Sequence, residues 1–193
     1  MVRYITPLKK RMGANVAFSL LLAASWQATA QTAPAYESAF LDYAQVTKDY
    51  DTQRMSEYMH PEALKRFRKV IEAALHGSKK EQAAEVLLPL FSVSSAADFA
   101  RLTDMQAYKR MNDTIVKSSP ELVEMMSNST YEIVGSFVKD DVAYITYRLG
   151  VTVGGKPISS QVVQTLKVHD GKWLLLLPST AEGAIAGIEA RFH

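Results

Sequence analysis

The sequence predicts an α+β fold in which N-terminal amphipathic helices pack on one face of a C-terminal four-stranded (or larger) antiparallel curved β-meander. Two observations predict this class. Up to about residue 126, apolar residues recur every three or four positions, as they do on one face of a helix. From Tyr131 onwards the period is two, and three short turn signals separate four alternating runs. Helices that need a partner and a sheet with one apolar face complete each other in such a fold.

The first thirty residues have the composition of an export signal. They combine a basic start at Arg3 and Lys9–Arg11, an apolar stretch over residues 14–26, and small residues at Ala28 and Ala30, as signal peptidases require. The apolar stretch is shorter than the roughly 20 residues that a membrane-spanning helix needs. The alternative is a buried N-terminal helix.

We therefore expect residues 1–30 to be a cleaved signal peptide. Residues 31–193 should then form a single domain without a transmembrane segment. The signal also predicts a secreted protein, in the periplasm.

Charge and cysteine content limit the partners and cofactors. The first thirty residues hold four of the 22 Lys and Arg residues and none of the 20 Asp and Glu residues, so residues 31–193 have a formal charge of −2. Nucleic acid requires a strongly basic surface, so we expect no nucleic-acid partner. The chain has no cysteine and therefore no disulfide or thiolate ligand. Its histidines lack ligand spacing, and we expect neither a metal nor another cofactor.

The first three helices have clear start and stop signals. An aromatic stripe at positions 36, 40, 43 and 50 predicts the first helix, and Asp51 is a suitable cap for a short second helix. Pro61 suits the first turn of a third helix, because its missing N–H has no partner there in any case. Gly77 is expected to end that helix.

The next part of the chain, residues 65–130, is predicted to be a helical segment. Ser78 and Glu81 match a capping box for a helix over residues 79–91, which Pro89 should end or kink. Three more helical patterns follow, at residues 95–102, 103–117 and 120–126.

Two turn signals determine the pairing of the last three strands. Gly154-Gly155 and Asp170-Gly171 are strong signals for two-residue hairpins. The first turn pairs Ile145 with Gln164, and the second pairs Leu166 with Leu175. Both registers place apolar residues on one side of the three strands, and a slip of one residue would reverse that face.

The first hairpin, around residues 139–141, leaves two registers open. A three-residue loop places Tyr131, Ile133 and Phe137 on the inner face of the sheet. A two-residue loop places Glu132 and its alternate neighbours there instead. We prefer the three-residue loop because it buries no charge.

Three features of the sequence carry a resemblance to a known family. They are the aromatic first helix, the short second helix in DTQRMSEYMHPEAL, and the closing meander with its Asp-Gly-Lys-Trp turn at residues 170–173. In these features the chain resembles the NTF2-like (cystatin-like α+β roll) superfamily. The resemblance covers residues 36–64 and 131–178. Residues 65–130 depart from it, because the superfamily usually has a strand pair before its third helix. The resemblance implies a conical cavity under the helices, which is catalytic in some members and binds a small molecule or a partner in others.

The predicted inner face of the last three strands offers no acid or base to such a cavity. Its polar side chains are Tyr147, Ser160 and Gln164, joined by Tyr131 in the preferred register. A general base must titrate near the working pH, which neutral hydroxyls and amides do not. Either these residues orient a small apolar ligand, or they bond to each other, to helix ends or to buried water. A buried amide without partners costs about 1–3 kcal/mol, so Gln164 should have one.

His60 is the one helix-side candidate for catalysis. It precedes Pro61, where the second helix meets the third. As an acid or base it would make the protein an isomerase, dehydratase or hydrolase. The alternative is that it caps the helix or lies on the surface.

The opposite, outer face of the sheet is also apolar. Its candidates for a dimer interface are Tyr144, Val163, Leu174 and Leu176. Such a patch is too apolar to remain in water, and NTF2-like domains often pair through this face. We expect a homodimer, with the alternative that residues 180–192 fold over the face.

The first functional hypothesis is thus a secreted, non-enzymatic NTF2-like domain that binds a small apolar ligand or a protein partner. The second is an enzyme that uses His60 or a helix-borne carboxylate. The third is a structural or assembly domain that acts through the outer sheet face.

Overall fold

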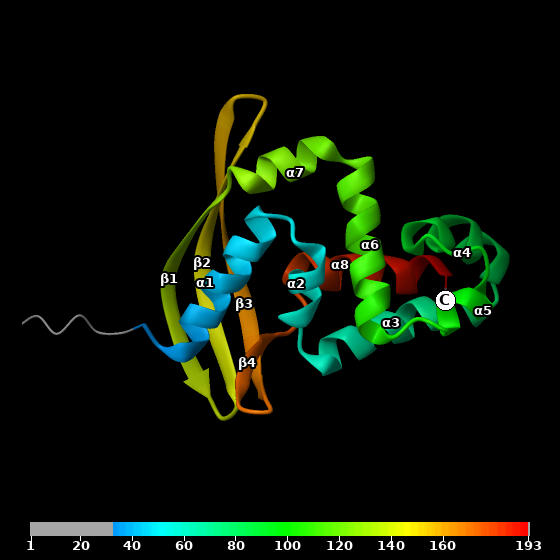
Figure 1. Ribbon diagram of the computed structural model, residues 1–193, viewed down its shortest axis with the longest axis horizontal. Helices are drawn as coiled ribbons and strands as arrows, with labels where there is room; N and C mark the ends of the chain where they lie inside the picture. The colour runs from blue at the N-terminus through cyan, green and yellow to red at the C-terminus, as the bar shows by residue number, and fades with distance from the viewer. Residues whose placement is uncertain (1–32, 193) are drawn as a thin grey trace, which may run out of the picture. The chain divides into compact units, whose positions relative to one another are not determined.

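The computed structural model describes residues 33–192, and it confirms the α+β class (Figure 1). The helices are α1 (Ala35–Lys48), α2 (Thr52–Glu57), α3 (Pro61–His76), α4 (Lys80–Leu87), α5 (Ala96–Ala100), α6 (Asp104–Ser118), α7 (Pro120–Ser127) and α8 (Ser179–Phe192), with a 3-10 turn η1 (Leu88–Phe91). The strands are β1 (Thr130–Lys139), β2 (Val142–Val153), β3 (Lys156–His169) and β4 (Lys172–Leu175). The predicted signal peptide lies outside the described residues. Within them, no helix has both the length and the apolar character to cross a membrane.

The helix boundaries follow side-chain caps at most of the predicted positions. The Asp51 carboxylate accepts a hydrogen bond from the Arg54 N–H, and Gly77 is the C-cap of α3. Thr103 and Gln106 form a reciprocal capping box at the start of α6. The capping box predicted at Ser78 is wrong. Because α4 begins only at Lys80, Ser78 lies one residue before the N-cap and makes no cap bond.

The sheet is a meander with the order β1-β2-β3-β4. Both predicted registers are confirmed, since Ile145 pairs with Gln164 and Leu166 pairs with Leu175. The helices α1 and α2 lie on one side of this sheet (Figure 1). This side is the inner face, and its buried residues Ala143, Ile145 and Leu166 form part of the core.

Strand β1 corrects the preferred register of the first hairpin. Lys139 pairs with Val142, so the loop has two residues rather than three. Phe137 therefore pairs with Tyr144 on the outer face, and not on the inner face as expected. A bulge between Ile133 and Gly135 inserts one extra residue, which returns Ile133 and Tyr131 to the inner face. The bulge keeps the charge of Glu132 outside, which the simple two-residue register would have buried.

The core continues from the sheet into the helical segment. Between residues 65 and 130 the described chain is helical, apart from connections, until β1 begins at Thr130. Aromatic rings from α3, η1, α5 and α6 pack edge-on there, with Phe91 and Phe99 4.7 Å apart between ring centroids. The C-terminal helix α8 buries Ile185 and Phe192, and Arg66 of α3 forms an ion pair with Glu182 of α8. The helix α8 thus packs mainly on α3 and also touches β3. Phe137 and Val163 stay exposed, so α8 does not cover that part of the outer sheet face.

Candidate functional site

Aromatic side chains fill the inner face where the sequence predicted a cavity. Tyr131 and Tyr147 stack with their ring centroids 5.7 Å apart, and Tyr147 lies 4.7 Å from Phe40 of α1. Burial raises the pKa of Tyr147 to about 12, so its hydroxyl stays neutral at ordinary pH. These three rings close the space between α1 and the sheet.

Gln164 is buried, and its bonds are internal. Its side chain is 2% exposed, and its amide nitrogen donates to the carbonyl oxygens of Thr165 and Leu176 at 2.9 Å and 2.8 Å. The amide therefore fastens the segment after β4 to β3, which supports the structural alternative for this residue. Ser160 lies four residues away on the same face of β3, but it is exposed. The structure therefore does not enclose Ser160 with Gln164 and Tyr147 in one pocket.

His60 is a helix cap at the junction of α2, α3 and β4. It is 3% exposed, and its Nδ1 accepts a hydrogen bond from the Glu62 N–H at 3.1 Å. The backbone N–H of His60 donates to the backbone carbonyl of Leu175 at 2.8 Å. The centroid of the His60 ring lies 5.3 Å from that of the His169 ring. Because the Nδ1 lone pair is engaged in the cap, this nitrogen takes up a proton only if the cap bond breaks. This geometry matches the capping alternative for His60.

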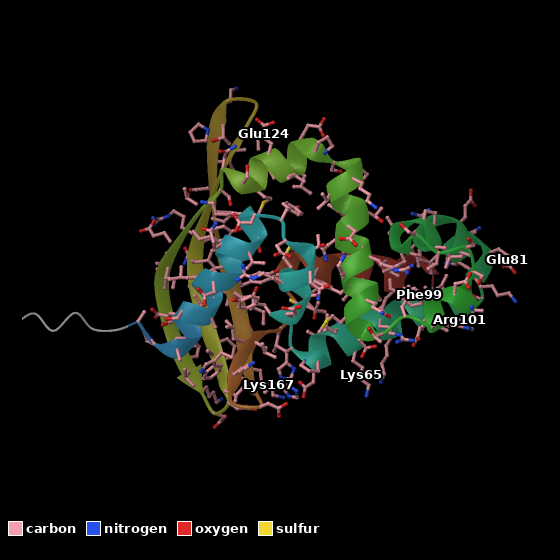
Figure 2. The ribbon with its side chains drawn as sticks, in the orientation of Figure 1. Lys65, Glu81, Phe99, Arg101, Glu124 and Lys167 are labelled. Atoms are coloured by element: carbon pink, nitrogen blue, oxygen red, sulfur yellow. The ribbon has the colours of Figure 1, made fainter. Side chains whose placement is uncertain are left out.

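The charges around His60 favour its neutral form on balance. Burial lowers the pKa of His60, and the nearby charges of His169 and Lys167 lower it further, while Glu62 and a backbone hydrogen bond to Val168 raise it. Glu62 and Lys167 form an ion pair of 3.0 Å beside the ring. Lys167 lies at the β4 end of the sheet (Figure 2). The described residues hold no group of three or more His, Asp or Glu side chains placed to bind a metal ion.

The outer sheet face carries the exposed aromatic and aliphatic surface. Phe137 stacks on Tyr144 with a centroid separation of 4.8 Å and an interplanar angle of 13°, and it is 59% exposed. Val163, on the neighbouring strand β3, is 50% exposed. Leu174 and Leu176 are partly buried. The sequence thus predicted Tyr144 and Val163 on this face, but it missed Phe137. The two-residue turn that places Phe137 outside was not preferred, because without the bulge in β1 it would have buried Glu132, and the bulge has no clear sequence signal.

Two further hollows lie away from the predicted pocket. An open trough of about 570 Å³ separates α7 from the β2–β3 turn, and its apolar side chains are Leu122, Met125 and Val153. Glu121 and Glu124 add charge to the trough, and Figure 2 shows Glu124 on α7 near that hairpin. The periodicity of residues 120–126 predicted the helix, but nothing in the sequence indicated that the hairpin extends beyond the core beside it.

A second groove of about 570 Å³ runs along α3 towards α8. Its basic residues are Lys65, Arg66 and Lys69, and its acidic residues are Glu62 and Glu189. Arg66 is paired with Glu182 and Glu62 with Lys167, and the remaining basic and acidic side chains of the groove are of both signs. This groove therefore has the character of a solvated surface.

The comparisons with known proteins do not supply a family. No protein-family model matches the chain, and a search of curated proteins finds no match. The functional assignment therefore depends on the surfaces of the molecule itself.

Proposed function

We propose that the chain is an exported, non-enzymatic NTF2-like domain that binds a protein partner through the outer face of its sheet. The observation that carries the proposal is the exposed ring of Phe137, stacked on the half-buried ring of Tyr144 and accompanied by the exposed Val163. Aromatic residues are enriched in the buried centre of protein interfaces, and exposed apolar patches of this kind mark contact surfaces.

The outer face has the size of a small interface. With twelve residues at about 3.4 Å each, β2 is roughly 40 Å long. Because β4 has only four residues, three long strands at about 4.8 Å spacing set the width at roughly 10–15 Å, and hence the area is on the order of 500 Å². A typical specific interface buries about 800 Å² on each partner, and weaker complexes bury less. The size of the face therefore suits a small or transient protein interface.

A second copy of the chain is the first partner to consider. Glu132 and Arg148, which lie opposite each other on this face, form an ion pair. Because these two charges neutralise each other within one chain, they do not repel their counterparts when two such faces approach. The homodimer predicted for this face is therefore part of the proposal.

Export and the NTF2-like relationship are proposed on separate grounds. The basic start, apolar stretch and small-residue pattern of residues 1–30 support export. The placement of α1 and α2 on one face of an antiparallel meander supports the relationship. The capping role of His60 and the neutral tyrosines of the inner face favour binding over catalysis.

The test is analytical ultracentrifugation of residues 31–193. We expect Phe137→Asp to weaken association at least tenfold, because it places an unpaired charge in the buried centre of the interface. Leu41→Asp is the matched control, since Leu41 is an exposed apolar residue on α1. A wild-type protein that stays monomeric at 100 µM and captures no partner from its host would refute the proposal, as would a Phe137→Asp variant that associates like the wild type.

A small apolar ligand in the trough between α7 and the β2–β3 turn is the second candidate function. The volume of about 570 Å³ and the apolar side chains of Leu122, Met125 and Val153 favour it. Native mass spectrometry of protein purified from its host tests this candidate. We expect a bound ligand that Met125→Glu removes and that Met105→Glu, at an exposed site on α6, retains. Repeated recovery of an empty protein would exclude it.

A further inference from the structure

Strand β3 has a free edge beside the short strand β4. β3 runs from Lys156 to His169, whereas β4 pairs with it only from Leu166 to His169. One more bond, from the Leu176 N–H to the Thr165 carbonyl at 2.9 Å, ends this pairing. The half of β3 nearest the Gly154-Gly155 turn therefore has β2 as its only neighbour among the described strands.

The hydrogen bonds at the ends of β3 show which backbone groups face this edge. The Thr165 carbonyl points towards β4, and the Val168 N–H points the other way, towards Asp141. In an antiparallel strand the N–H and C=O of one residue point to the same side, and successive residues alternate. Ser159, Gln161 and Val163 therefore present both groups to the free edge. Within residues 33–192 none of these groups bonds to another element, and all three residues are exposed.

The free edge lacks the usual protection against pairing. Natural edge strands are commonly protected by charged side chains, above all lysine, by bulges or by proline. Residues 157–166 carry no charged side chain, and β3 pairs with β2 from Lys156 to Lys167 without a bulge. Pro157 alone lacks a donor on this edge. At the other end, the Gln164 amide donates to the carbonyls of Thr165 and Leu176 and completes the junction with β4.

We propose that residues 159–163 of β3 pair with the same residues of a second copy in an antiparallel arrangement. The two four-stranded sheets then form one continuous sheet of eight strands. The two-fold axis passes between Gln161 and Gln161 of the partner subunit, and Ser159 lies opposite Val163 of the partner subunit. All three residues face the edge with both backbone groups, so each of the three opposed pairs exchanges two hydrogen bonds.

The proposed pairing stops at residues 159 and 163, because the next residues on the edge have no free N–H or no free carbonyl. The next pair would join Pro157 to Thr165 of the partner subunit. Pro157 has no N–H, and the carbonyl of Thr165 already accepts from Leu176 and Gln164. A second copy thus satisfies the edge residues over five positions and requires no other group. Because the segment is uncharged, the self-pairing brings no like charges together.

This interface is independent of the one in the proposed function. Ladder hydrogen bonds lie in the plane of the sheet, so edge pairing leaves Phe137, Tyr144 and Val163 on the outer face. The two outer faces then lie side by side on one continuous surface. Each edge-paired dimer therefore offers two binding sites to a partner that binds the outer face.

Cysteine cross-linking tests the register directly, since the chain contains no cysteine. Residues in a hydrogen-bonded pair lie about 5.5 Å apart between Cα atoms, which is within the span of a disulfide. We expect Gln161→Cys to form a disulfide-linked dimer under mild oxidation. Ser159→Cys alone should not, because its own copies are roughly 13 Å apart in this register. An equimolar mixture of Ser159→Cys and Val163→Cys should give a mixed disulfide.

Two results would overturn the proposal. One is a Gln161→Cys variant that stays monomeric on oxidation. The other is a Ser159→Cys variant that cross-links as well as Gln161→Cys, because that pattern indicates random collision. Gln161→Lys provides a second readout, since it places two positive charges beside the axis and should lower the yield of the mixed disulfide between Ser159→Cys and Val163→Cys at least tenfold.

Phe137→Asp separates this interface from the outer-face interface. If Phe137→Asp in the Gln161→Cys background leaves the cross-link intact, the edge pairs without the outer face. If the cross-link is lost, the copies associate through the outer face and edge pairing is refuted. A cross-linked dimer without outer-face association would refute the proposed homodimer of that face and leave the edge proposal standing.

Discussion

The cap at His60 predicts that stability falls in mildly acidic solution. The folded protein holds the His60 ring neutral, because burial lowers its pKa and Nδ1 accepts the bond from the Glu62 N–H. In the unfolded chain the ring titrates at its ordinary pKa of about 6.5. Below that pH the unfolded chain binds a proton that the folded chain does not, so the free energy of unfolding decreases as the pH falls. The contribution is present in full above about pH 6.5 and is lost towards the lower folded pKa.

The size of the effect on the free energy of unfolding follows from one proton bound by the unfolded chain and one helix cap in the folded chain. A single proton gives a slope of at most about 1.4 kcal/mol per pH unit between the two pKa values. His60→Ala removes the cap bond, at a cost of about 1 kcal/mol. It also removes the buried ring 5.3 Å from His169, for which a further 1 kcal/mol is a reasonable estimate. We expect His60→Ala to lower the free energy of unfolding by about 2 kcal/mol at pH 7.5.

The assay is urea unfolding of residues 31–193 from pH 5 to pH 8, followed by the fluorescence of Trp173. His60→Asn retains a cap acceptor and cannot titrate in this range, so it should be more stable than His60→Ala and should lose most of the pH slope between pH 5 and 6.5. His76→Asn is the control, because His76 is exposed near the end of α3. If the slope of His60→Asn equals that of the wild type, the titrating group is another residue and the reasoning is wrong.

Three further predictions concern stability in urea unfolding at pH 7.5. Phe99→Ala should lower the free energy of unfolding by about 3–5 kcal/mol, because Phe99 is fully buried against Phe91. Phe99→Leu should lower it much less, and a loss below about 1 kcal/mol for Phe99→Ala would contradict this packing. Gln164→Leu should cost about 2 kcal/mol despite the similar side-chain volume, because the Leu176 carbonyl loses its side-chain donor and the Thr165 carbonyl loses one of its two donors. An unchanged midpoint would show that water replaces the amide. Gly171→Ala should lower the free energy of unfolding by about 1 kcal/mol, because the φ of Gly171, +74°, suits glycine. Gly183→Ala in α8 is the control, and it should leave the stability unchanged or raise it.

The helices and hairpins that the sequence predicted correctly are those with local causes. The cap at Asp51 and the start of α3 at Pro61 involve residues within one turn of the helix start. The turns at Gly154 and Gly171 require positive φ, which glycine adopts at low cost, and each sets the register of the strands beside it. These features depend on a few neighbouring residues, so a single sequence is enough to find them.

The predicted pocket residues had no such local cause. Alternation placed Tyr131, Tyr147, Ser160 and Gln164 on one face of the sheet, and the structure retains that face. Side chains of α1 pack on that face, among them Phe40, which is about one hundred residues away in the sequence. Packing with the helix therefore decided that the rings are core, that Gln164 bonds internally and that Ser160 remains exposed.

By itself, the sequence determined the fold class, the order of helices and strands up to β4 and the pairing of the last three strands, because periodicity and turn chemistry act over short distances; it did not predict the C-terminal helix α8. Only the tertiary structure decided the bulge that keeps Glu132 outside, the buried position of His60 and the place where β4 leaves β3. Each of these depends on which distant segment arrives beside a given residue. The free edge of β3 illustrates the difference, since its uncharged residues are visible in the sequence but the shortness of β4 beside them is not.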